Sequence, residues 1–152
     1  MPLFEGCFLF PNDNERVSDV SQMSNTVLKT FSAGDDLSSA RYHFVKLGTG
    51  VDDVVLVDDP GDIPIGIVTD FYRADEGMPV TVAIGGTCKV VAAGAIARGA
   101  WVGSNADGRA VAKDADGDMV RGIALEAATN AGDIIEVMLV GPFVLNVPGT
   151  GS

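Results

Sequence analysis

The 152-residue sequence has one histidine, two cysteines and one tryptophan, so it offers few of the side chains that enzymes and metal sites use. A catalytic Ser–His or Cys–His pair would need His43. This residue stands between Tyr42 and Phe44 and is interpreted as a structural or surface histidine. A metal site built on several histidines is disfavoured for the same reason. Cys7 and Cys88 do not form a disulfide framework and are expected as free thiols. These shortages predict a protein that is not an enzyme and holds no metal or cofactor.

Positive charge and long apolar runs are also scarce. Ten basic residues face 21 acidic ones, which gives a formal net charge of −11. A protein with this negative charge repels DNA, RNA and anionic membranes, so nucleic acid and membranes are not expected as partners. No apolar run approaches the ~20 residues that cross a bilayer. The apolar stretch at residues 1–10 lacks the basic flank of a signal peptide, and none is predicted.

Acidic and glycine-rich motifs are present but do not fit known binding loops. Residues 114–118 read DADGD, which is superficially similar to a calcium loop. Its glycine is the fourth residue rather than the sixth, and the twelfth residue is Leu125 rather than glutamate. No phosphate-binding GxxxxGK[ST] motif occurs. The DADGD run is therefore interpreted as a hairpin turn.

A repeated motif organises the rest of the chain. Residues 61–68 read GDIPIGIV and residues 117–124 read GDMVRGIA, with Gly66 matched by Gly122. Two flanking pairs of segments also align, 27–34 with 87–94 and 77–86 with 132–141. A repeat that cannot bury its own apolar face packs against its neighbour. We therefore predict an all-β fold, a small antiparallel β-barrel or sandwich built from two tandem copies of a unit of about 55 residues.

The alternation of apolar residues and turn signals places the strands of this domain. Strands are expected at 27–31, 41–47, 54–57, 63–69, 80–84, 87–92, 101–102, 119–125 and 134–140, with a helical turn at 127–131. Phe44 is expected to face the core, and Trp101, which aligns with it, is expected to do the same. Residues 142–147 align with the opening strand and are expected to pair beside it, which would close the barrel. The duplicated domain thus covers residues 26–147, and 148–152 are expected to be a flexible tail.

Residues 1–25 lie outside the repeat and are predicted to be an N-terminal arm and linker. The first ten residues hold five large apolar side chains, which are followed by a polar, turn-rich stretch. Two interpretations stay open, an additional strand on its own barrel or an anchor that docks on another surface. The candidate contacts of such an anchor with another surface are Leu3, Phe4, Phe8, Leu9 and Phe10.

The pattern of glycines and strand residues between 27 and 141 resembles the small decoration or cement proteins of tailed-phage heads. The resemblance is carried by Ala93-Gly94, Asp107-Gly108, Gly117-Asp118 and the segments 122–126 and 131–137. It implies a non-enzymatic structural protein of the virion, made in the host cytoplasm and bound to the outer capsid surface. It further implies the major capsid protein as partner, a homotrimer, and a role in cementing neighbouring capsomers.

Two other classes are compatible with short duplicated strands. A small β-barrel carrier or ligand-binding domain would present a modified lysine in a tight hairpin, but Lys89 lies within a predicted strand and Lys113 precedes the aspartate-rich turn. An enzyme on a barrel scaffold ranks last because His43 stands alone.

Overall fold

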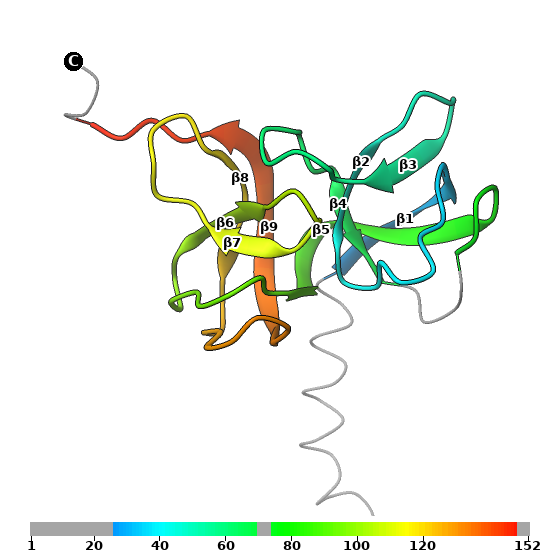
Figure 1. Ribbon diagram of the computed structural model, residues 1–152. Coiled ribbons are helices and arrows are strands. Elements are labelled where there is room, and N and C mark those ends of the chain that lie inside the picture. The colour runs from blue at the N-terminus through cyan, green and yellow to red at the C-terminus, as the bar shows by residue number, and fades with distance from the viewer. Residues whose placement is uncertain (1–25, 70–73, 149–152) are drawn as a thin grey trace, which may run out of the picture.

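The computed structural model describes residues 26–69 and 74–148, and these residues form an all-β fold without a helix (Figure 1). The strands are β1 (Thr26–Ala33), β2 (Phe44–Leu47), β3 (Asp53–Leu56), β4 (Gly66–Val68), β5 (Pro79–Val91), β6 (Trp101–Ser104), β7 (Ala110–Ala112), β8 (Met119–Ala124) and β9 (Ile134–Val144). Within the described part of the chain, no helix is long and apolar enough to cross a membrane.

The strands pair in two similar rings that share β5. In the first half, β5 pairs with β4, β4 with β2, β2 with β3, β3 with β1 and β1 with β5; only the β1–β3 pairing is parallel. In the second half, the C-terminal part of β5 pairs with β9, followed by β8, β6 and β7. A parallel bridge between Ala92 and Ala110 then joins the end of β5 to β7. The predicted all-β, sandwich-like class is confirmed, and Figure 1 shows the two halves side by side.

The same backbone hydrogen bonds fix the ends of both halves. The Gly77 N–H donates to the Ala33 carbonyl at 2.7 Å, and the Gly132 N–H donates to the Ala92 carbonyl at 2.8 Å. Both glycines have positive φ angles, 87° and 93°, which suits the turn before the last strand of each half. The halves therefore repeat the same loop geometry as well as the same strand pairings.

Two apolar clusters form the core, and one of them joins the halves. The interior of the first half holds Ala33, Leu37, Ala40, Val45, Val54, Val68, Ala74, Val80 and Val82. The interior of the second half holds Cys88, Val90, Ala92, Ile96, Val102, Ala110, Ala124, Ala128, Ile135, Val137 and Leu139. Phe44, Val57, Ile67 and Ala83, which come from the first half, belong to this second cluster. An outward face of the first half thus covers the core of the second half.

The glycines of the repeated motif allow close crossing of neighbouring strands. A Cβ atom at Gly66 would lie 2.2 Å from the Ala83 carbonyl oxygen. A Cβ at Gly122 would lie 2.8 Å from the Met138 carbonyl oxygen. Ala83 and Met138 occupy matching places in β5 and β9, so each half requires glycine for the same close approach.

Several boundaries expected from the sequence are corrected. The segments 80–84 and 87–92 were expected as two strands but form the single strand β5, because Gly85 and Gly86 stay in the ladder rather than turning the chain. The expected strand 41–47 begins only at Phe44. The expected helical turn at 127–131 is absent, since Ala128 forms an antiparallel bridge with Ile96.

The expected closing strand at 142–147 does not pair with the opening strand. Phe143 and Val144 extend β9 and pair with Val120 and Met119 of β8. The sheet instead returns on itself through the pairing of β1 with β5. Residues 1–25 and 149–152 lie outside the described residues, so the arm and the tail remain predictions.

Candidate functional site

The residues that could carry chemistry are occupied in structural contacts. The Nδ1 atom of His43 lies 2.9 Å from the Arg41 carbonyl oxygen. Cys88 is buried, and this burial raises the pKa of its thiol to about 12, which disfavours the reactive thiolate. Among residues 26–69 and 74–148, no group of three or more His, Cys, Asp or Glu side chains is placed to hold a metal ion.

The aspartate-rich run at 114–118 is a turn, as predicted. The Asp118 carboxylate accepts a hydrogen bond from the Ala115 N–H at 3.0 Å. The Asp116 carboxylate accepts one from the Val147 N–H, also at 3.0 Å. These carboxylates fix backbone groups of the turn and of the segment that follows β9, which is the usual role of aspartate in turns.

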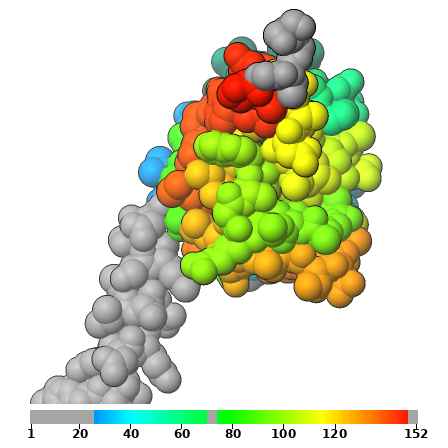
Figure 2. All heavy atoms as spheres, turned by 90° about the vertical axis from the view of Figure 1, so that its left-hand side faces the viewer, coloured from blue at the N-terminus to red at the C-terminus, as the bar shows by residue number. Residues whose placement is uncertain are grey.

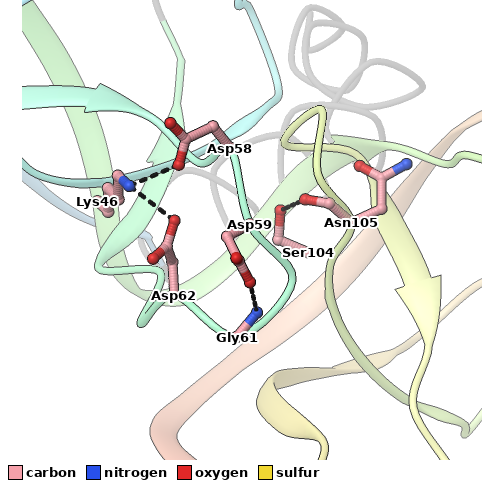
Figure 3. A network of polar contacts seen from close by, with 7 residues as sticks. All are labelled: Lys46, Asp58, Asp59, Gly61, Asp62, Ser104 and Asn105. Atoms are coloured by element: carbon pink, nitrogen blue, oxygen red, sulfur yellow. Dashed lines mark hydrogen bonds and ion pairs between the residues drawn. The ribbon is translucent and has the colours of Figure 1, made fainter.

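A charged network pins the loop between β3 and β4 (Figure 3). Lys46 Nζ lies 2.7 Å from carboxylate oxygens of both Asp58 and Asp62. Hydrogen bonds to these two carboxylates raise the pKa of Lys46, and the bond from Lys46 lowers the pKa of Asp58. The Asp59 carboxylate accepts the Gly61 N–H at 2.8 Å. Because the network is solvent-accessible, it shapes the loop more than it stabilises the fold.

A buried arginine joins the two halves. Arg121 on β8 is 5% exposed, and its guanidinium donates to four backbone carbonyls. Three of these acceptors belong to the first half, Pro64, Ile65 and Ile84, each at 2.9 Å, and the fourth is Val140 of β9. Burial lowers the pKa of Arg121 from its usual value. The arrangement is a structural clamp, since no substrate-sized space separates the donors from their acceptors.

Tyr42 adopts a backbone conformation that glycine adopts in the other half. Its φ angle is 63°, and the matching residue of the second half, Gly99, has a φ of 89°. Their N–H groups make equivalent bonds of 2.7 Å, to the carbonyls of Val68 and Ala124. The left-handed region costs a non-glycine residue about 1–2 kcal/mol. The Arg41 guanidinium lies 4.5 Å from the centre of the Tyr42 ring and donates to its hydroxyl at 2.9 Å.

Open grooves are present on the surface of the described residues, and the two described below do not gather catalytic groups. One has a volume of about 350 Å³ and is lined by Thr26, Leu28, Tyr42, Thr69, Thr87, Cys88, Lys89 and Glu136. The other has a volume of about 410 Å³ and is lined by Lys46, Leu47, Gly61, Asp62, Ile63 and Ile65.

The lysines weighed for a carrier domain are not at hairpin tips. Lys89 lies in the ladder of β5 opposite Glu136 of β9. Lys113 is buried, and its side chain packs where a Cβ of Gly103 would stand. Neither position presents a lysine for modification, so the structure lends no support to the carrier interpretation.

An exposed apolar row crosses the second half. Trp101 of β6 pairs with Ile123 of β8, and Ile123 pairs with Met138 of β9. Trp101 is 39% exposed and Met138 is 38% exposed. The Trp101 ring meets the Phe143 ring edge-on, with centroids 5.2 Å apart and an interplanar angle of 85°. The alignment with Phe44 placed Trp101 in the core; the structure places it on the surface.

The row is an additional candidate interface that the sequence did not single out. The predicted contacts Leu3, Phe4, Phe8, Leu9 and Phe10 all lie outside the described residues. A signal for the row was present, because Met138 replaces the small Ala83 at the matching position of the first half. The larger side chain extends the exposed apolar area of the row.

Comparison with known proteins identifies the family. The search of curated proteins gives no match. A solved structure of similar fold is the head fiber gp8.5 N base of bacteriophage phi29, with a TM-score of 0.58 and 22% identity, covering 76% of this chain and 94% of that chain. The family model described as "Phage cement protein" matches residues 22–139. The chain therefore belongs to the phage cement protein family, and it is a non-enzymatic structural protein of the phage capsid.

Proposed function

We propose that this protein decorates the outer surface of a phage head and cements it by bridging neighbouring capsomers. The observation that carries the proposal is the family match, which spans nearly all of the duplicated domain. The major capsid protein is the proposed partner. A clamp that binds only the assembled shell stabilises it by mass action and needs no chemistry.

A homotrimer is the proposed form of the clamp. Capsomers meet at three-fold and local three-fold positions, and a closed cyclic trimer matches such a position with three equal contacts. The exposed apolar row of Trp101, Ile123 and Met138 supports the presence of a further interface on each copy.

The N-terminal arm is the proposed anchor. Five large apolar side chains in ten residues, Leu3, Phe4, Phe8, Leu9 and Phe10, would be a liability in water. Burial of each contributes roughly 1.5–3 kcal/mol before ordering costs. The arm is proposed to dock on a neighbouring subunit or on the major capsid protein, with residues 12–25 as its tether.

We further infer that the domain arose by internal duplication of one unit. Matching strand pairings, matching loop hydrogen bonds and the matched glycines of β4 and β8 support this origin. Duplication supplies a pseudo-symmetric scaffold whose halves are free to diverge, one toward internal packing and the other toward a partner.

Thermal release of DNA tests the cementing role. Heads with and without the protein are heated, and DNA release is followed with a dye that the intact shell excludes. Heads that carry the protein are expected to release DNA at a higher temperature, and re-addition of purified protein to bare heads should restore that temperature. Equal release temperatures would remove reinforcement as the function.

A further inference from the structure

β5 leaves one edge open at the border between the two halves. Gly86 pairs with Thr26 of β1 on one edge and with Leu139 of β9 on the other. The ladder with β9 continues to Val91, whereas the described part of β1 begins at Thr26. Among the described residues, no strand pairs with the β1 side of β5 at residues 87–90. Figure 2 views the molecule from the side of the second half and shows β1, in blue, only at the margin of that view.

Backbone groups of β5 point toward this open edge. Glu136, the β9 partner of Lys89, uses both of its backbone groups on its other side. Its N–H donates to the Glu126 carboxylate and its carbonyl accepts the Leu125 N–H, each at 2.8 Å. Because paired residues of an antiparallel ladder face each other or turn away together, Lys89 directs its N–H and carbonyl away from β9. The Cys88 thiol lies 3.4 Å from the Lys89 carbonyl and so reaches the same edge.

Contacts at both ends define the length of the open edge. At one end, Thr26 Oγ1 donates to the Thr87 carbonyl at 2.8 Å. At the other end, the Tyr42 carbonyl accepts the Val91 N–H at 2.9 Å. Between them lies the groove of about 350 Å³ described above, whose lining includes Thr26, Tyr42 and three residues of β5. The edge to be covered is therefore the four residues 87–90.

We propose that residues 22–25 of the same chain fill this groove as a direct continuation of β1 along β5. The pairing of Thr26 with Gly86 sets the register. The resulting pairs are Asn25 with Thr87, Ser24 with Cys88, Met23 with Lys89 and Gln22 with Val90. The chain's own segment is favoured as occupant because it is bonded to Thr26, which already pairs at the end of the groove. No loop has to be closed to bring it there.

Two further observations support residues 22–25 as the occupant. The family match begins at residue 22 rather than at the first described residue, so the family's pattern includes these four positions. None of the four is proline or glycine, the residues that weaken a strand. The groove would also give the N-terminal arm a fixed departure point beside Tyr42, with residues 12–21 as the remaining tether. This departure point rests on the arm function proposed above, whereas the pairing along β5 does not.

A disulfide tests the register. Ser24 would stand opposite Cys88 in a non-hydrogen-bonded pair, whose Cα atoms lie about 4.5 Å apart, a separation that a disulfide spans. In the full-length chain with Cys7→Ser, Ser24→Cys is expected to form an intramolecular disulfide when oxidised with copper phenanthroline. Met23→Cys and Asn25→Cys would face the opposite side of the strand. These two control variants should form the disulfide several-fold less.

Non-reducing electrophoresis and peptide mass spectrometry identify the product, and circular dichroism verifies that each variant is folded. Disulfide-linked dimers in place of intramolecular disulfides would assign the groove to a second copy and overturn the proposal. Equal disulfide formation at residues 23, 24 and 25 would overturn it as well, because the segment would then have no fixed register.

Hydrogen exchange gives a readout that does not depend on cysteine chemistry. Proline at residue 23 removes the N–H that would donate to the Lys89 carbonyl and disrupts the added strand. Met23→Pro should therefore speed exchange of the Lys89 amide several-fold, measured by NMR on the full-length chain. Val20→Pro, in the tether, is the matched control and should leave that rate unchanged. An equal rate in both variants and in the unaltered protein would overturn the proposal.

Binding to heads separates this inference from the proposed function. The oxidised Ser24→Cys protein, whose segment is fixed in the groove, is expected to bind bare heads as well as its reduced form. If only the reduced form binds, the segment leaves the groove on the capsid, and the departure point of the arm is wrong. If the disulfide forms but neither form binds, the proposed function fails and the pairing along β5 stands.

Discussion

Arg121 Nη2 lies 2.9 Å from the carbonyl oxygen of Ile84, which hydrogen-bonds a side chain of β8 to the backbone of β5, the strand that both halves share. The same guanidinium also donates to the carbonyls of Pro64 and Ile65, which immediately precede β4. Because its acceptors are carbonyls, the charge is satisfied without a carboxylate partner. The two halves are therefore joined by a polar clamp as well as by an apolar core.

Replacement of Arg121 by methionine should destabilise the whole domain. The change keeps an apolar stem but removes donors from several buried carbonyls, which costs on the order of 3–5 kcal/mol. Urea denaturation should show this loss in one cooperative transition. Arg98→Met is the matched control, because Arg98 is exposed and donates one hydrogen bond, to the Leu125 carbonyl. Equal losses in the two variants would show that Arg121 is not a clamp.

Backbone conformation at Gly99 provides a second stability test. Its φ is 89°, and a Cβ added there meets nothing within 4 Å, so Gly99→Ala probes the left-handed conformation alone. The expected cost is about 1–2 kcal/mol. Gly94→Ala is the control, since a Cβ there also meets nothing and its φ is not in the positive range. A control that loses as much stability as Gly99→Ala would contradict this account.

The pH dependence of stability should include a contribution from Asp133. Backbone N–H groups of Asn130 and Thr129 donate to its carboxylate and lower its pKa below the usual 3.8. A pKa that is lower in the folded state gives stability that is present above the unfolded value and lost as pH falls through the folded one. Asp133→Asn should therefore lower the melting temperature at pH 7, and the difference from the unaltered protein should shrink below about pH 3.8. The exposed Asp107→Asn serves as control, and a difference that persists undiminished at pH 2 would refute the linkage.

The sequence predicted the all-β class but not how the halves meet. The sequence showed that Gly66 and Gly122 align but not why both are glycine. The structure gives the reason, because a Cβ at either position would collide with the backbone of the neighbouring strand. The segments 80–84 and 87–92 were expected as separate strands, yet pairing of Gly86 with both Thr26 and Leu139 keeps the ladder continuous. The Arg121 clamp was unpredictable, since its partners are carbonyls that any residue supplies. Trp101 was wrongly expected in the core because it aligns with Phe44. The alignment does not show that this position is buried in the first half and exposed in the second.

Removal of residues 1–12 tests the N-terminal anchor. The described residues from β1 onward already form two buried apolar clusters, so the truncated protein is expected to fold with a nearly unchanged melting temperature. It should lose binding to heads, because several apolar anchors at roughly 1.5–3 kcal/mol each would be missing. Substitution of Phe4, Phe8 and Phe10 by serine in the full-length chain should reproduce the loss, while polar substitutions in the tether at 12–25 should not. Binding is measured by sedimentation with bare heads and stability by thermal denaturation. If the truncation instead unfolds the isolated domain, the arm is part of its own core and the anchor hypothesis is wrong.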